Sequence, residues 1–133
     1  MPRYVVLLAS AALLGAIPAV VGAQGPGPFT AAQADRGQAT FNQNCSMCHG
    51  EDMGGGAGAP ALAGAEFAYG WKGKPVSALF DKVSTTMPPG AEGSLSAQQY
   101  LDVISAIMRK NGAAPGAAEL APGGAGLKAV VLP

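Results

Sequence analysis

Cys45-Ser46-Met47-Cys48-His49 is the stretch around which the rest of the chain is organised. Two cysteines separated by two residues, with a histidine directly after the second, form the attachment pattern of a c-type haem. The spacing suits the chemistry, because each thiol adds to one vinyl group of the porphyrin and the two sulfurs must lie a fixed distance apart. The histidine then lies where its ring can reach the iron as the proximal ligand. The sequence therefore predicts one covalent haem c, bound through Cys45 and Cys48 and ligated by His49.

Two other uses of a Cys-x-x-Cys pair fit this chain less well. A structural zinc site needs four Cys or His ligands, whereas the chain has two cysteines and one histidine, all within this pentapeptide. Zinc would therefore have to recruit carboxylates. A thioredoxin-like dithiol expects an alternation of strands and helices around the motif, and no strand-rich alternation flanks it. Haem attachment remains the favoured interpretation.

The N-terminus has the pattern of an export signal. Arg3 supplies one positive charge, residues 4–21 are almost entirely apolar, and small residues follow. This order predicts a secretory signal peptide at residues 1–23, cleaved after Ala23, with Ala19 as an alternative site. A retained membrane anchor is the alternative to cleavage, because the apolar run is at the lower edge of a membrane span. Export would place the protein in the periplasm, with membrane attachment only if this segment is retained.

Composition narrows the kind of molecule. The 133 residues include eight basic and eight acidic side chains, so the formal charge is zero and no basic patch suggests a nucleic-acid partner. The chain is rich in Gly and Pro, with 20 and 11 residues, and only 6% of it is aromatic. Such a chain buries a thin apolar core by itself. We therefore expect the haem-free protein to be poorly folded, as in small proteins whose metal supplies folding free energy.

Three helices are expected in a domain spanning residues 31–112, after a Gly/Pro-rich linker at residues 24–30. The first covers residues 31–44, with Thr30 as its N-cap and a costly internal glycine that implies a close helix contact. The second begins with Pro75 as its first residue and runs to about Ser84, with Leu79, Phe80 and Val83 on its buried side.

The third helix follows Ser96, which forms a capping box with Gln99. Its apolar residues recur at helical spacing, and Asn111-Gly112 ends it. Residues 113–133 form a Gly/Ala/Pro-rich tail whose expected anchors are Leu120, Leu127, Val130 and Val131. This tail either wraps the domain as irregular structure or is partly disordered.

Met87 is the best candidate for the second axial ligand. There is no second histidine, and Met87 lies in Thr85-Thr86-Met87-Pro88-Pro89-Gly90, where two prolines exclude helix and stiffen the loop. Met47 lies between the cysteines, and Met53 is too close to His49 in sequence to reach the opposite face of the porphyrin. Met108 fits the buried face of a helix. His/Met ligation is common in cytochromes c. A methionine packed beside an open iron is the alternative.

Cys45-Ser46-Met47-Cys48-His49 together with Ala59-Pro60-Ala61-Leu62-Ala63-Gly64 resembles the class I cytochrome c family. The resemblance implies an all-α fold, with about three to four helices around one covalent haem and long Gly/Pro-rich loops. It also implies that the Pro60 carbonyl accepts a hydrogen bond from His49 and that Leu62 packs on the haem. Pro60 could instead simply stiffen the loop. Trp71 is expected to border the haem propionates, or else to be an ordinary core aromatic.

The same resemblance implies that the first and last helices cross, with Gly37 and Phe41 against Tyr100 and Ile104. Three further segments are similar to small bacterial periplasmic cytochromes, which often occur beside quinone-cofactor dehydrogenases: residues 85–90, 94–96 and 111–120.

The function implied is a periplasmic electron carrier rather than an enzyme, passing electrons from a dehydrogenase-type donor to a respiratory acceptor. Its redox partners, including a separate quinone-cofactor dehydrogenase and a terminal oxidase, would dock at the exposed haem edge. The alternatives are a fixed cytochrome subunit of a dehydrogenase or oxidase complex, and an open-iron haem enzyme or sensor.

Overall fold

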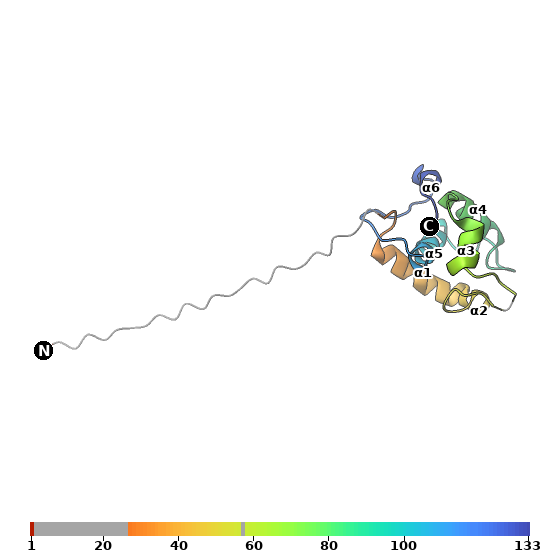
Figure 1. Ribbon diagram of the computed structural model, residues 1–133, viewed down its shortest axis with the longest axis horizontal. Helices are drawn as coiled ribbons and strands as arrows, with labels where there is room; N and C mark the ends of the chain where they lie inside the picture. Colours follow the sequence, from red (N-terminus) through yellow and green to blue (C-terminus); the bar gives the residue numbers. More distant parts are fainter. Residues whose placement is uncertain (2–26, 57) are drawn as a thin grey trace.

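The computed structural model describes Met1, residues 27–56 and residues 58–133. Residues 2–23 of the expected signal peptide and residues 24–26 of the expected linker lie outside these described residues. The described part is helical, with two isolated β-bridges (Gly56 with Ala59 and Pro75 with Val131) and no longer strand. This confirms the all-α prediction. Figure 1 shows the helices in chain order: α1 (Ala31–Asn44), α2 (Ser46–His49), α3 (Gly64–Trp71), α4 (Val76–Thr86), α5 (Ala97–Lys110) and α6 (Gly126–Ala129). None of the helices in this part of the chain is long and apolar enough to cross a membrane.

The two longest helices begin at the caps that the sequence predicts. The Thr30 hydroxyl accepts a hydrogen bond from the backbone N–H of Gln33 at 3.0 Å, and α1 spans the predicted residues. Ser96 and Gln99 form a complete capping box at the start of α5. Each cap satisfies N–H groups that have no partner within the helix. These local interactions fix where α1 and α5 start.

Helices α1 and α5 cross at Gly37, as predicted. A Cβ atom on Gly37 would lie 1.8 Å from the carbonyl oxygen of Asp102 and 2.9 Å from the backbone nitrogen of Val103. Any side chain there would push the helices apart, so glycine is required for the close approach. The tightest contact is thus with the backbone around Asp102, whereas Tyr100 and Ile104 were the expected partners. Phe41, Tyr100 and Ile104 are all buried.

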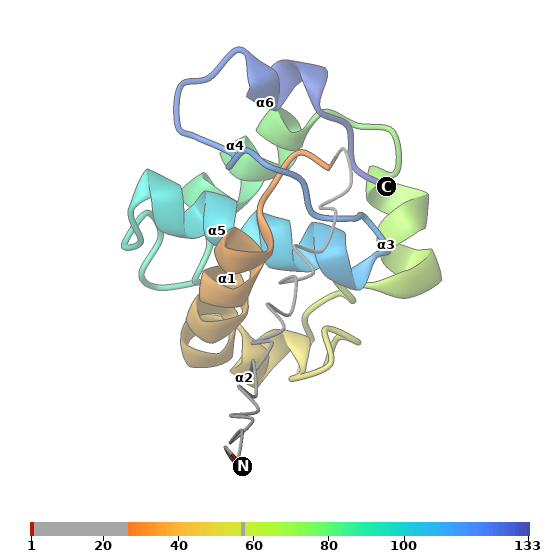
Figure 2. The same ribbon diagram turned by 90° about the vertical axis from the view of Figure 1, so that its left-hand side faces the viewer.

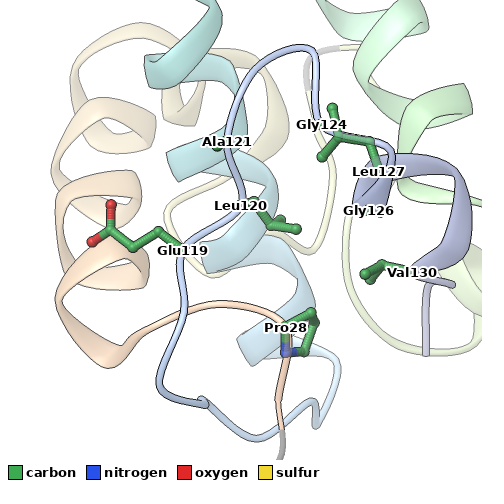
Figure 3. Close-up of a pocket in the computed structure, with 8 residues that line it drawn as sticks. All are labelled: Pro28, Glu119, Leu120, Ala121, Gly124, Gly126, Leu127 and Val130. Carbon is green, nitrogen blue, oxygen red and sulfur yellow. The ribbon is translucent and has the colours of Figure 1, made fainter.

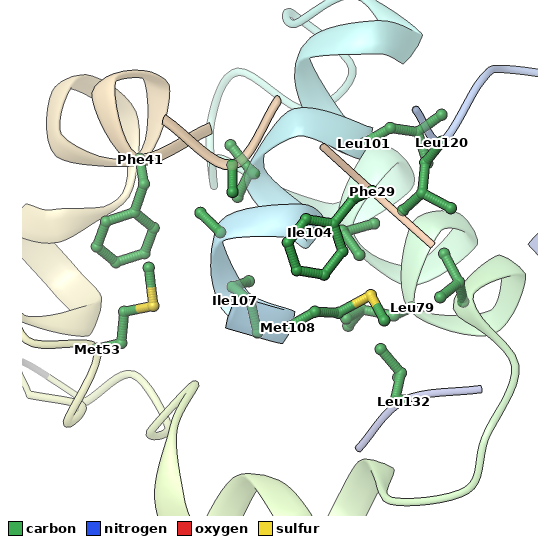
Figure 4. Close-up of a cluster of buried hydrophobic side chains, with 14 of the residues drawn as sticks. Phe29, Phe41, Met53, Leu79, Leu101, Ile104, Ile107, Met108, Leu120 and Leu132 are labelled. Atoms are coloured by element: carbon green, nitrogen blue, oxygen red, sulfur yellow. The ribbon is translucent and has the colours of Figure 1, made fainter. Parts of the chain in front are cut away.

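Helix α5 forms the centre of the apolar core (Figure 4). Every residue from Tyr100 to Met108 is buried, because α1 and α4 pack against the helix and the tail bonds to it through the Leu120 carbonyl. The core also takes side chains from the segments before and after the helices: Phe29, Phe41, Met53, Phe67, Val76, Leu79, Leu120, Leu127 and Leu132. The helix with the clearest sequence pattern, α5, is therefore the one against which the other segments pack.

A buried polar network joins α1, α5 and the tail. The Gln33 amide donates to Asp102 Oδ1 at 3.1 Å and to the Leu120 carbonyl at 2.9 Å, and it accepts from the Leu120 N–H at 2.8 Å. Arg36 bridges Asp102 at 3.1 Å and Glu119 at 2.8 Å. Its hydrogen bonds raise the pKa of Arg36 and lower the pKa of the Glu119 carboxyl. Because Gln33 is fully buried, its amide needs these partners.

The tail lies on the opposite side of α5 from α2 (Figure 2). Its backbone bonds to the α3–α4 turn, where Gly73 N–H donates to the Leu132 carbonyl and Leu132 N–H donates to the Lys74 carbonyl, both at 2.9 Å. Leu120 and Leu127 are buried as expected, but the expected anchor Val131 is 56% exposed and Leu132 is buried instead. The error arises because extended residues alternate in direction, and the sequence does not show which of the two faces inward.

Three other helical details differ from the sequence predictions. Pro75 is the N-cap of α4 rather than its first residue, and α4 continues two residues beyond Ser84 to Thr86. Leu79 is buried, whereas Phe80 and Val83 are half-buried. Helices α3 and α6 were not predicted, because Gly-rich composition hides their periodicity. The proposed domain boundaries at residues 30 and 112 stay predictions.

Candidate haem site

The two cysteines lie on one turn at the end of α1. Cys45 is the C-cap of α1, where its N–H donates to the Phe41 carbonyl at 2.8 Å, and the single turn α2 carries Cys48. Both thiols are free. Cys48 is exposed and Cys45 is half-buried, and burial raises the pKa of the Cys45 thiol to about 11, with a smaller contribution from Cys48. One short turn therefore presents two unpaired thiols, which is the arrangement that attachment to a porphyrin edge needs.

His49 is held in one orientation and one tautomer. Its Nδ1 lies 2.8 Å from the Pro60 carbonyl oxygen, which can only accept, so Nδ1 carries the proton. This is the contact that the resemblance implies. The imidazole is 7% exposed, and Nε2 makes no hydrogen bond within the described residues. Because Nδ1 is engaged with the carbonyl, Nε2 is the ring nitrogen left to bind a metal, and the carbonyl fixes the direction of the ring.

The loop after His49, residues 50–63, is called the proximal loop below. Gly55 N–H donates to the His49 carbonyl and Leu62 N–H donates to the Met53 carbonyl, each at 2.8 Å. Met53 is 1% exposed and packs in the core near Phe41, with φ at 64° (Figure 4). Leu62 is half-buried against the same core. The described part of this glycine-rich loop is thus folded around a buried methionine.

Asn111 ties this loop to the end of α5. Its side-chain amide donates to the Leu62 carbonyl at 2.9 Å and to the Ile107 carbonyl at 2.9 Å. Its Oδ1 accepts from the N–H of Gly64 at 3.0 Å. Two of these three hydrogen bonds therefore hold the segment that follows Pro60, the acceptor for His49.

Met87 lies at the C-cap of α4 and opens the loop of residues 87–96, called the distal loop below. Its N–H donates to the Val83 carbonyl at 3.0 Å, which continues the helical pattern. Its carbonyl accepts a hydrogen bond from the Tyr100 hydroxyl at 2.7 Å. The residue is half-buried. Its backbone is therefore fixed on both sides, by α4 and by α5.

The other methionines lie where the sequence predictions put them. Met47, between the cysteines, is 92% exposed, and Met108 is buried in the α5 core as expected. Met53 belongs to the proximal loop, on the His49 side. Met87 thus remains the candidate for the other axial position.

Trp71 is the last residue of α3 and is half-buried. Its ring packs against Phe67, with centroids 6.4 Å apart, and Lys74 Nζ lies 5.1 Å from its centroid. A cation over an indole face is attractive. The role of Trp71 beside the haem propionates stays a prediction.

Two surface hollows lie away from the candidate ligands. One, of about 320 Å³, lies beside the cysteine turn and is lined by polar residues of α1, α2 and the loop after them: Gln38, Asn42, Ser46 and Glu51. The other, of about 280 Å³, lies under the tail near Pro28 and is more apolar (Figure 3). Neither hollow is lined by His49 or Met87. Within the described residues no group of three or more His, Cys, Asp and Glu side chains is arranged to hold a metal ion.

Residues 32–105, more than half of the chain, match the family described as cytochrome c oxidase, cbb3-type, subunit III. The chain belongs to this family. It is a c-type cytochrome, and the spacing of Cys45, Cys48 and His49 identifies its cofactor as covalent haem c. The free thiols and the His49 ring, held through Nδ1, fit this cofactor. The family also gives the cytochrome a role in haem electron transfer.

Among solved structures, the cytochrome is similar to the sulfane dehydrogenase SoxCD from Paracoccus pantotrophus. The two are 26% identical, with a TM-score of 0.49, and the match covers 79% of this cytochrome and 58% of that chain. A comparison with curated proteins finds no match.

The sequence analysis named the candidate ligands but did not identify the residues that hold their segments in place. Tyr100 was expected only at a helix crossing, and Asn111 only as a helix stop. Each makes its key contact with a segment more than ten residues away along the chain. A polar side chain at the end of an apolar helix face is the one sequence feature that could have drawn attention to both.

Proposed function

We propose that this cytochrome is a periplasmic electron carrier with a single haem, in which His49 and Met87 are the axial ligands. The haem supplies one-electron cycling between Fe(II) and Fe(III), and the protein contributes its ligands and surroundings. The observation that carries the proposal is the fixed His49 imidazole, whose Nδ1 donates to the Pro60 carbonyl at 2.8 Å and whose Nε2 is left to bind the iron. Met87, anchored by α4 and α5, supplies a thioether from a different part of the chain.

Ligands at both axial positions distinguish a carrier from an enzyme. An enzyme or gas sensor needs an open position, with polar side chains able to act on what binds there. The candidate ligand segment here instead offers a thioether beside two prolines. For this reason we favour electron transfer over catalysis.

Redox partners would dock at the surface around the cysteine turn. Cys48 and Met47 are exposed there, and the acidic residues Glu51 and Asp52, also exposed, follow directly. This surface suits a partner with basic side chains around a small apolar contact, an arrangement that gives fast and weak encounters. A separate quinone-cofactor dehydrogenase as donor and a terminal oxidase as acceptor are the proposed partners.

The test is the absorption spectrum of the holoprotein in both oxidation states, compared with Met87→Ala. The wild type should be low-spin, and Met87→Ala should become high-spin and bind carbon monoxide. Met53→Leu is the matched control, because it replaces a buried methionine on the His49 side and should stay low-spin. A wild type that is already high-spin and binds carbon monoxide would contradict the proposal and favour an open-iron enzyme or sensor.

A fixed subunit of a respiratory complex is the second candidate, favoured by the description of the family as an oxidase subunit. A carrier should purify alone, whereas a subunit should co-purify in constant ratio with its complex. Mass measurement of the natively extracted cytochrome distinguishes them. The same native sample, analysed for its N-terminal residue, tests the expected cleavage after Ala23.

A further inference from the structure

Tyr100 connects the first turn of α5 to the backbone of Met87. The tyrosine ring is buried, and its hydroxyl donates to the Met87 carbonyl at 2.7 Å. A short hydrogen bond from a buried, rigid side chain fixes its acceptor well, because an aromatic ring has only two side-chain torsions to restrict.

The rest of the distal loop is held mainly by bonds within itself. Ala91 N–H donates to the Pro88 carbonyl at 2.9 Å, and Ser94 N–H donates to the Ala91 carbonyl at 3.2 Å. Gly90 N–H donates to the Glu92 carboxylate at 2.8 Å. Within the described residues, the Tyr100 hydroxyl makes the one hydrogen bond between residues 87–95 and α5. The Met87 N–H holds the residue to α4, and this side chain provides its hydrogen bond to α5.

We propose that Tyr100 is a positioning residue for the axial ligand Met87. By holding the Met87 carbonyl, it sets the direction in which the thioether leaves the backbone and slows the movement of the distal loop away from the haem. This inference rests on the function proposed above. Tyr100 would act through Met87 and not as a ligand itself.

Tyr100→Phe isolates the hydroxyl, because the ring that packs in the core is kept. The matched control is Ser105→Ala, which removes another buried hydroxyl from the same helix. The Ser105 hydroxyl donates to the Leu101 carbonyl at 2.9 Å, within α5 and away from the distal loop. Both variants lose one hydrogen bond from a hydroxyl to a backbone carbonyl, so a general loss of stability should affect them similarly.

The measurement is the rate at which imidazole displaces the methionine in the ferric holoprotein, followed by the charge-transfer band of methionine-ligated haem. Tyr100→Phe should speed displacement about fivefold, the factor expected from losing one intramolecular hydrogen bond. Ser105→Ala should leave the rate unchanged, while guanidinium chloride unfolding shows similar stability for both variants.

Two results would overturn the proposal. One is a displacement rate in Tyr100→Phe equal to that of the wild type. The other is an equal acceleration in Ser105→Ala, which would mean that the effect is general destabilisation. A wild type that lacks the methionine band would instead overturn the axial assignment of Met87, and this inference with it. The wild-type spectrum therefore distinguishes the two failures.

Discussion

The proximal loop follows His49 and the distal loop begins with Met87, the two candidate ligands. The two loops differ in the hydrogen bonds and burial that hold them to the rest of the protein. In the proximal loop, backbone bonds link Gly55 to His49 and Leu62 to Met53, and Asn111 adds bonds from α5. In the distal loop, the described hydrogen bonds between residues 87–95 and α5 reduce to that of the Tyr100 hydroxyl. The proximal loop also buries Met53, whereas most distal-loop residues are exposed.

This difference indicates unequal local stability around one cofactor. Segments with few buried contacts open at lower free energy than the core does. His49 is therefore expected to stay in place while Met87 can be released without global unfolding. The predictions that follow test this contrast, from the largest expected effect to the smallest.

Asn111→Ala should have the largest effect, because it removes three hydrogen bonds and leaves the Leu62 carbonyl without its donor. We expect the free energy of unfolding of the holoprotein to fall by about 2 to 3 kcal/mol, measured by guanidinium chloride denaturation. Asn44→Ala is the control: Asn44 also ends a helix and bonds the carbonyl four residues back, at 2.9 Å, but joins no other segment. Equal losses in the two variants would contradict the special role of Asn111.

Alanine at two glycines of similar φ compares the loops directly. Gly55 has φ of 84°, and its Cβ would lie 2.9 Å from the Ala61 nitrogen, whereas Gly90 has φ of 83° and nothing within 4 Å. Both variants suffer backbone strain, and Gly55→Ala adds a steric clash. We expect thermal unfolding to give a loss of about 2 kcal/mol for Gly55→Ala and about 1 kcal/mol for Gly90→Ala. Equal losses of unfolding free energy would mean that the proximal loop accommodates the added methyl group as easily as the distal loop does.

Hydrogen exchange tests the contrast without mutation. The amides of Gly55 and Leu62 should exchange at least about tenfold more slowly than those of Ala91 and Ser94, since local opening releases the distal loop first. Exchange measured by NMR on the reduced holoprotein gives the rates, normalised for the intrinsic rate of each residue. Similar protection in both loops would remove the basis for the comparison.

Acid should loosen the distal loop slightly through Glu92. The hydrogen bond from Gly90 N–H holds the pKa of the Glu92 carboxyl below its ordinary value of 4.5. Because the pKa of Glu92 is lower in the folded state, its carboxylate stabilises the fold at pH values above the ordinary pKa. This contribution is lost as the pH falls through the lowered pKa of the folded state. Glu92→Gln keeps an acceptor but does not titrate. Its stability difference from the wild type should be small, present at neutral pH and absent in acid; a difference that is constant with pH would be the contrary result.

The sequence predicts those parts of the fold that depend on neighbouring residues. Thr30 and the Ser96–Gln99 pair cap helices within one turn, so α1 and the start of α5 were predicted correctly. Gly37 indicated the helix crossing because glycine destabilises a helix unless a close backbone contact requires it. Helix α3 was missed, since two of its eight residues are glycines and its N-cap makes no side-chain bond.

The candidate site divides in the same way. Cys45, Cys48 and His49 are adjacent in sequence, so their chemistry is readable there, and Pro60 followed from the family resemblance. The bond from Tyr100 to Met87 and the bonds of Gln33 to Leu120 join distant segments. They depend on how helices pack, which no local pattern records.

The number of residues between Tyr100 in α5 and Asn111 at its C-cap limits the insertions and deletions that the protein can tolerate. The two residues lie about three helical turns apart, which places both on nearly the same side of the helix and separates them by about 16 Å. Inserting one residue between them would rotate one anchor by about 100° relative to the other. The number of residues between these two positions therefore has to stay constant if both sets of hydrogen bonds are to be kept. The length of α5 is thus a constraint on the whole family of sequences that could keep this site.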